Sequence, residues 1–327
     1  MRTKRFLPPA LLVLVLGIVV ATTWVTLPYY TEGPGPAREV IPLIHVDGPP
    51  VYASGGKLIM TTVEFRHATA FTAFLAWLDP HRRVLDEDAL YPDGQTQAEE
   101  EQRSLSQMDT SKIDAAYVVL EELSGYPADH GNGALIESVS PGCPAEGELF
   151  AGDLILSLNG DPVSSRAEAL KAFDEIPSGH PITFRVRAAG ETHELSLTRR
   201  SCVQDRPPLV GITMVPNFPY RIRIESGDVG GPSAGLMYAL GLYDLLTPDD
   251  LTGGRTIAGT GTIDLEGSIG PIGGIGDKVV AAEGEGADVF LVPAGNLKGA
   301  RAAVAGSMQI VSVASFKDAL EFLEGSS

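Results

Sequence analysis

Apolar and polar positions repeat along this chain with two different periods, which predicts a mixture of helices and strands. Strict alternation over 182–187 and 191–198 predicts two strands, each with one polar face. From Thr110 to Leu123 the apolar residues recur at helical spacing, and Ser111 with Asp114 predicts a capping box. An almost unbroken apolar run from Ala234 to Leu246 predicts a buried helix. Three more elements are expected, namely a strand over Lys57–Phe65 and helices over Ala70–Trp77 and Ser165–Ile176.

An uncharged stretch runs from Phe6 to about Tyr30 behind a basic N-terminal flank. It is long enough to cross a bilayer, and Trp24, Tyr29 and Tyr30 fall where interfacial aromatic residues are expected. Residues 1–30 therefore predict a cytoplasmic flank and a single transmembrane helix, with everything after Pro28 outside the cytoplasm. A cleaved signal peptide is the alternative, although residues 19–21 make a poor cleavage site.

Composition narrows the choice of partners and cofactors. The 24 basic and 42 acidic residues give a net charge of −18, which argues against nucleic acid and anionic membrane surfaces as partners. The six histidines show no paired-ligand spacing, so neither a metal nor another cofactor is predicted. Cys143 and Cys202 are the only cysteines, and whether they pair stays open.

One serine, Ser233, lies between a Gly-Pro turn and the predicted buried helix. Gly230 and Gly231 permit a tight backbone approach, and Pro232 suits a first helical turn because it lacks the N–H that would be unpaired there. Free amide donors and the positive end of the helix dipole converge on this serine. Ser233 is therefore a candidate nucleophile, and an ordinary helix N-cap is the alternative.

A second glycine-rich turn, over 267–276, leads into Lys278 at the start of a short apolar helix. The neighbouring Ile272, Ile275 and Val279 favour low-dielectric surroundings for its ammonium group. Taken alone, such a residue is more often a solvated surface lysine.

Together the two segments resemble the proteolytic domain of the Lon-type serine peptidases, over roughly 207–325. The nucleophile of that family lies in Gly-Pro-Ser-Ala-Gly, which is intact at 231–235. Its lysine base follows Pro-Ile-Gly-Gly, which is intact at 271–274. The resemblance implies a catalytic dyad of Ser233 and Lys278.

This dyad chemistry requires a neutral lysine, because only an unprotonated amine can accept the serine proton. Lowering a lysine pKa from about 10.4 to about 7 to 8 takes roughly 3 to 5 kcal/mol, which burial can supply. The resemblance also implies that Thr260 hydrogen-bonds the lysine, with an ordinary strand threonine as the alternative. For the oxyanion we expect backbone N–H groups around Gly231 and Ser233, since fixed donors suffice for this role.

The chain departs from the family pattern at three positions. Gly230 stands where cytosolic Lon enzymes often carry an acidic residue, and Thr262 where they carry a glutamate. Gly276 replaces an additional lysine that many members have. These differences leave the dyad intact and bear on substrate preference and fine positioning.

Rival chemistries have less support in the sequence. A Ser-His-Asp triad stays open because its members need only meet in space, but no histidine lies in the stretch that carries Ser233 and Lys278. The chain contains no GxxxxGK[ST] motif, so hydrolysis of ATP is not expected.

Residues 125–200 contain Ala-Gly-Asp-Leu-Ile at 151–155 and an Asn-Gly hairpin turn at 159–160. This segment resembles a bacterial PDZ domain, a β-sandwich or barrel that binds an extended peptide between a strand edge and a helix. The loop that would receive a peptide carboxylate is expected before Gly133, over Leu123–Pro127.

The combination resembles the membrane-anchored PDZ-Lon proteins of bacteria, with an α+β fold divided into 1–30, 31–124, 125–200 and 201–327. It implies an ATP-independent serine endopeptidase that cleaves unfolded or flexible protein segments outside the cytoplasm, with the PDZ domain selecting or positioning substrate. Homo-oligomers, hexameric in cytosolic Lon, are implied as well. The alternative is a catalytically silent scaffold that retains a Lon-like fold.

Overall fold

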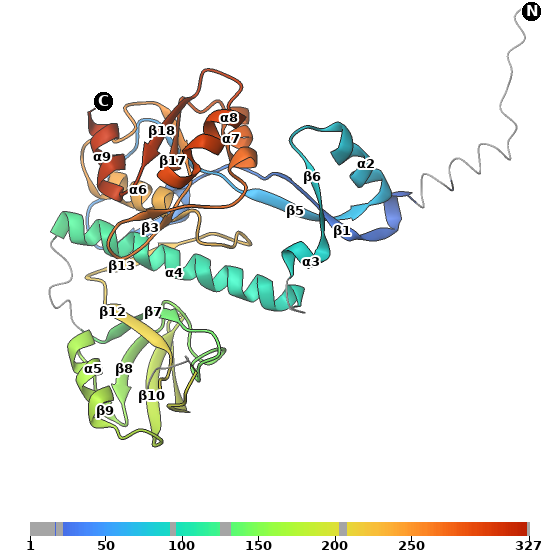
Figure 1. Cartoon of the computed structure of the whole chain (residues 1–327). Coiled ribbons are helices and arrows are strands. Elements are labelled where there is room, and N and C mark those ends of the chain that lie inside the picture. Colours follow the sequence, from blue (N-terminus) through green and yellow to red (C-terminus); the bar gives the residue numbers. More distant parts are fainter. Residues whose placement is uncertain (1–16, 18–21, 92–95, 125–131, 203–207, 326–327) are drawn as a thin grey trace, which may run out of the picture.

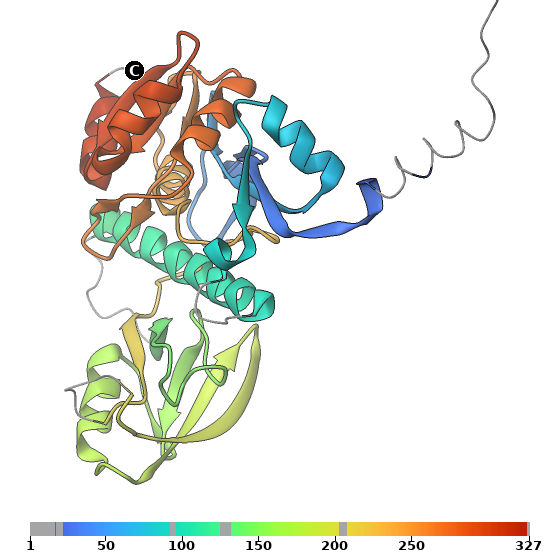
Figure 2. The ribbon, with the colours of Figure 1, turned by 45° about the vertical axis from the view of Figure 1, so that its right-hand side comes forward.

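The computed structural model describes residues 17, 22–91, 96–124, 132–202 and 208–325. Figure 1 shows a body that holds the C-terminus, an arm of strands beside it and a β-rich domain. The long helix α4 (Gln97–Ser124) runs between the body and the β-rich domain, as Figure 2 also shows from a second direction. The chain is thus a mixed α+β protein, as predicted.

The body is built on a five-stranded sheet in the order β18-β17-β14-β4-β2, in which only β2 is antiparallel. All five residues of β17 are buried, as expected for a parallel strand covered on both faces. In β4, Leu58 and Met60 pack into the same core as helix α6, while Ile59 packs into the core of α7. The sheet strands are β2 (Arg38–Glu39), β4 (Lys57–Met60), β14 (Thr256–Gly259), β17 (Val289–Pro293) and β18 (Gln309–Val313). The helices of the body are α6 (Gly235–Leu246), α7 (Ile275–Gly284), α8 (Leu297–Ala303) and α9 (Phe316–Glu324). Two small antiparallel ladders pair β3 (Ile44–Asp47) with β13 (Arg221–Ile224), and β15 (Thr262–Ile263) with β16 (Ile269–Gly270).

The arm is a three-stranded antiparallel sheet in the order β5-β1-β6. The strand expected over 57–65 is divided at Thr61 and Thr62, so that its first half joins the body and its second half joins the arm. Helix α2 begins at a Thr69–Thr72 capping box and is almost entirely apolar, yet only Ala76 is buried. The arm elements are β1 (Thr26–Pro34), β5 (Val63–Thr69), α2 (Ala70–Leu78), β6 (Arg83–Asp86) and α3 (Glu87–Leu90).

The predicted transmembrane helix is wrong. No helix within the described ranges is both long enough and apolar enough to cross a membrane. Residues 26–34 form β1, and Tyr30, expected at a membrane interface, is 3% exposed inside the arm. Pro28 disfavours a helix interior, and the threonines and tyrosines around it favour a strand. The predicted single-pass localisation depended on this helix and is wrong for the same reason, while 1–16 and 18–21 lie outside the described residues.

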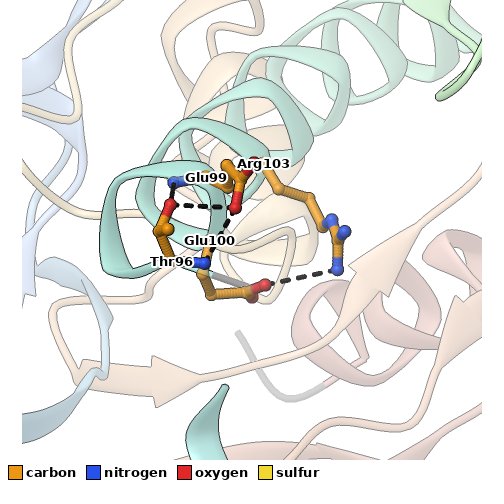
Figure 3. A network of polar contacts seen from close by, with 4 residues as sticks. All are labelled: Thr96, Glu99, Glu100 and Arg103. Atoms are coloured by element: carbon orange, nitrogen blue, oxygen red, sulfur yellow. Dashed lines mark hydrogen bonds and ion pairs between the residues drawn. The ribbon is translucent and has the colours of Figure 1, made fainter. Parts of the chain in front are cut away.

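Helix α4 begins thirteen residues before the start predicted for it at Thr110, because its N-terminal cap lies at Thr96. The backbone N–H and hydroxyl of Thr96 both donate to the Glu99 carboxylate at 2.8 Å, and the Glu99 N–H donates to the Thr96 hydroxyl at 3.2 Å. Figure 3 shows this reciprocal cap, with an ion pair of 3.3 Å between Glu100 and Arg103 beside it. Glu99 therefore caps the start of the helix, and the capping box predicted at Ser111 lies in the helix interior.

The β-rich domain is a sheet in the order β11-β10-β8-β7-β12, with β9 paired to β8. The alternating pattern predicted for 182–187 matches the structure, since Ile182, Phe184 and Val186 are all fully buried. Cys143 and Cys202 form a disulfide with Cα atoms 5.0 Å apart. The elements are β7 (Ala134–Val139), β8 (Leu154–Leu158), β9 (Asp161–Pro162), α5 (Arg166–Glu175), β10 (Pro181–Ala188), β11 (Glu191–Thr198) and β12 (Ile212–Pro216).

The domain bounds 31–124, 125–200 and 201–327 remain a proposal. Strand pairing crosses the boundaries after residues 124 and 200. β2 and β4, from the region before residue 124, are members of the body sheet. β12, from the region after residue 200, pairs with β7 at the edge of the β-rich domain. The carboxylate-receiving loop expected at Leu123–Pro127 begins inside α4, and its residues 125–127 lie outside the described residues.

Candidate functional site

Ser233 lies on the turn that leads into α6. The helix begins at Gly235, and its N-cap residue is Ala234, whose side chain makes no capping bond. Ser233 therefore precedes the N-cap, and the alternative role of an ordinary helix cap does not apply to it. Its backbone carbonyl accepts hydrogen bonds from the Gly261 N–H at 2.8 Å and from the Thr260 hydroxyl at 3.0 Å. These two bonds fix the peptide group of Ser233 against the loop after β14.

Lys278 lies in the first turn of α7, which follows Gly274 in a left-handed conformation at φ 65°. Its Nζ is 3.0 Å from Ser233 Oγ and 2.8 Å from the Thr61 carbonyl oxygen. The residue is 4% exposed, and this burial lowers the pKa of Lys278 to about 8. The structure thus brings Ser233 and Lys278 together, with the amine in surroundings that favour its neutral form.

Thr61, which the sequence did not single out, is the second partner of Lys278. It lies where the chain leaves β4 for the arm, is 3% exposed, and donates its hydroxyl to the Gly259 carbonyl at 3.4 Å. The Lys278 bond is made by a backbone oxygen 217 residues away in the chain. No side-chain pattern in the sequence could have indicated it.

Thr260 is fully buried beside the site, but its contact differs from the expected one. Its hydroxyl donates to the Ser233 carbonyl, so its proton is directed to the serine backbone and not to Lys278. Its own N–H bonds the Leu291 carbonyl at 3.1 Å in the body sheet. Thr260 therefore holds the serine turn, while the lysine is held by Thr61.

Gly231 also has a different partner from the one expected. Its φ of 81° is a conformation that favours glycine, and its N–H donates to the Ser104 carbonyl of α4 at 2.8 Å. That N–H is therefore already engaged and is not available to an oxyanion. For the described part of the chain, no hydrogen bond involves the N–H groups of Ser233 and Ala234 at the N-terminus of α6.

The dyad lines an open cleft of ≈ 670 Å³ between the body, the arm and α4. One wall is the start of β5, from Val63 to Phe65, and no histidine is among the lining residues. Beside the cleft, Arg83 of the arm bridges Glu32 at 3.0 Å and Asp277 of α7 at 3.2 Å. Glu32 and Asp277 are both buried, and the ion pair between Arg83 and Asp277 ties the arm to the helix that carries Lys278.

Two regions of the chain match known domain families. Residues 220–323 match the Lon protease (S16) C-terminal proteolytic domain, and residues 121–186 match the PDZ domain. The chain therefore contains a Lon-type proteolytic domain preceded by a PDZ domain.

Curated relatives align with about one third of this chain. A Lon protease of Phenylobacterium zucineum is 37% identical over 107 residues, which are 32% of this chain and 13% of that protein. Lon protease 2 of Bacillus subtilis is 33% identical over 105 residues, or 32% of this chain and 18% of that protein. This chain thus spans less than a fifth of the length of either relative. Among solved structures, the PDZ domain of an SdrC-like protein from Listeria innocua is 25% identical, with a TM-score of 0.24, over 25% of this chain and 93% of that one.

Proposed function

We propose that this chain is a serine endopeptidase with Ser233 as the nucleophile and Lys278 as the general base. The observation that carries the proposal is the 3.0 Å contact between Ser233 Oγ and the Nζ of a buried lysine whose pKa is lowered to about 8. An amine with this pKa is partly neutral near pH 7, and it lies within reach of the hydroxyl proton.

In the proposed reaction, neutral Lys278 accepts the Ser233 proton as Oγ attacks the peptide carbonyl. The resulting ammonium then gives that proton to the leaving amine, which leaves an acyl-enzyme and a neutral lysine. Lys278 next takes a proton from water, whose oxygen attacks the ester, and returns it to Ser233 Oγ. The Thr61 carbonyl stays bonded to Nζ throughout and orients it.

The charge that develops on the substrate oxygen requires fixed donors. We assign this role to the N–H groups of Ser233 and Ala234, because they lie at the N-terminus of α6 and have no other partner in the described structure. Gly231, expected to take part, instead fixes the turn through Ser104.

We further propose that the substrates are unfolded or flexible polypeptide segments and that cleavage requires no ATP. The sequence has no GxxxxGK[ST] motif to bind a nucleotide. The cleft is open, and its wall residue Phe65 is 46% exposed on β5, the edge strand that leads into α2. Phe71, Phe74 and Trp77 of α2 are also exposed, so apolar side chains of an extended substrate have a surface to contact beyond the cleft.

For the PDZ domain we propose a role in selecting or positioning protein substrates, based on the peptide-binding mode of such domains. We also propose that the chain assembles into homo-oligomers. This proposal is based on the resemblance to cytosolic Lon, which forms hexamers.

The test is cleavage of an unfolded protein by the purified chain and by Ser233→Ala, with labelling by a serine-reactive fluorophosphonate probe. We expect Ser233→Ala to lose both cleavage and label while its thermal unfolding is unchanged. Ser307→Ala, which alters an exposed serine away from the cleft, is the matched control and should keep both. Full cleavage by Ser233→Ala would refute the nucleophile, and a correctly folded wild-type chain without cleavage or label would favour the silent scaffold.

A further inference from the structure

Helix α4 contacts the backbone of the turn immediately before Ser233 at two points. The Ser104 carbonyl accepts the Gly231 N–H at 2.8 Å, and the Ser111 hydroxyl donates to the Pro232 carbonyl at 3.0 Å. Residues 104 and 111 are separated by about two helical turns, so they lie on the same face of α4. One face of this helix thus holds the peptide groups on both sides of the Gly231–Pro232 bond.

Gly230 shows how closely the helix approaches. A Cβ atom at this position would lie 2.3 Å from the Ser104 Oγ and 3.0 Å from the Ser104 Cβ. The φ of Gly230 is outside the left-handed range, so an alanine could adopt this backbone conformation. The neighbouring helix, and not the local conformation, is what requires glycine here.

The opposite side of the turn is fixed as well. The Ser233 carbonyl is held by Gly261 and Thr260 of the body, and Ser233 Oγ meets Lys278 at 3.0 Å. The turn is therefore held between α4 and the body sheet, and its position sets the distance between Oγ and Nζ.

The same helix is attached to the PDZ domain. The Thr110 hydroxyl donates to the Glu137 carbonyl of β7 at 3.2 Å. Pro232 of the turn lines a second cleft, of ≈ 1240 Å³, together with α4 residues and with Leu149 and Phe150 of the PDZ domain. The element that touches the nucleophile turn is thus also held by the domain proposed to select substrates.

We propose that α4 is a positioning element of the peptidase, with Ser104 and Ser111 as positioning residues that place the Ser233 turn from the PDZ side. This inference rests on the proposed Ser-Lys activity. Displacing the turn from its position against α4 would change the contact between Oγ and Nζ while leaving most of the substrate cleft unchanged, so the effect should fall on kcat and not on KM.

The test is a double-mutant cycle with Gly230→Ala and Ser104→Gly. Gly230→Ala should lower kcat on the order of 10²-fold, as expected for a misplacement of about 1 Å, with KM changed by less than about 3-fold. In the Ser104→Gly background, where both clashing side-chain atoms are absent, the loss caused by Gly230→Ala should be at least about 10-fold smaller. Gly284→Ala, at a position in α7 where an added Cβ meets nothing within 4 Å, is the matched control for the glycine substitution.

An equal loss in both backgrounds, or no loss in either, overturns the inference. Hydrogen exchange of the segment 228–236 supplies a readout that does not need activity. Gly230→Ala should speed exchange there, and the second substitution should restore protection. If the wild-type chain does not cleave, the proposed peptidase activity is refuted. The hydrogen-exchange measurements still decide whether α4 holds the turn. Unchanged exchange in Gly230→Ala would show that α4 does not hold it.

Discussion

The pH dependence of the reaction is the sharpest consequence of burying Lys278. Its pKa is lowered from 10.5 to about 8 because the charged form is desolvated. At pH 7 the neutral fraction of the lysine is then about 9%, compared with about 0.03% for an unshifted lysine, a gain of roughly 300-fold. Expressed as free energy, the shift is about 3 kcal/mol against the ammonium form.

Because the neutral lysine is the proposed base, the acylation rate should rise about 10-fold per pH unit below pH 8 and level off above it. The assay is kcat/KM for an unfolded protein substrate between pH 6 and 10, together with the second-order rate of labelling by a fluorophosphonate probe. The probe rate reports Ser233 reactivity without substrate binding, so both curves should share a midpoint near pH 8. A flat profile, or a midpoint near the usual histidine pKa of about 6.5, would show that Lys278 is not the base.

The lowered pKa of Lys278 also determines how the free energy of unfolding depends on pH. Since the folded pKa is lowered, the unfolded chain binds the proton more tightly, and burial of Lys278 opposes folding at every pH below about 8. This cost should diminish as the pH rises from about 8 towards 10.5.

Three further outcomes are expected. Lys278→Arg should be inactive between pH 6 and 9 because a guanidinium stays protonated there, and wild-type rates from this variant would refute the base assignment. Thr260→Val removes the hydroxyl that holds the Ser233 carbonyl, so kcat should fall about 10-fold, for a loss of roughly 1 to 1.5 kcal/mol, and an unchanged kcat would mean that the Gly261 bond suffices. Replacing both Cys143 and Cys202 by alanine should lower the free energy of unfolding of the PDZ domain by about 4 kcal/mol, because their bond closes a loop with a sequence separation of 59, and urea unfolding with and without the disulfide measures it.

Much of the local structure follows from the sequence. The alternating pattern of β10 and the apolar run of α6 were assigned to the correct element type, because each segment buries the face that its period defines. The capping residues of α4, Thr96 and Glu99, also stand in the sequence, but the predicted box at Ser111 and Asp114 has the same spacing. Local patterns of this kind are ambiguous when two candidates lie within one helix.

The N-terminal prediction failed for a related reason. An uncharged segment can be a membrane helix or a strand paired along both edges, and hydropathy does not separate the two. In β1 the choice is made by pairing with β5 and β6, which come from residues 63–69 and 83–86. Pro28 was the local signal against a helix.

The sequence alone determined which residues form the candidate dyad, because two intact motifs carry Ser233 and Lys278 in the order that the Lon-type resemblance requires. Only the tertiary structure decided what surrounds them. The Thr61 carbonyl holds the amine, the Thr260 hydroxyl holds the serine backbone, and Ser104 of α4 takes the Gly231 amide. Two of these three contacts are made by backbone oxygens from distant elements, and every residue has such an oxygen. A sequence pattern can therefore identify the reacting side chains, while the groups that position them become visible only when the chain is folded.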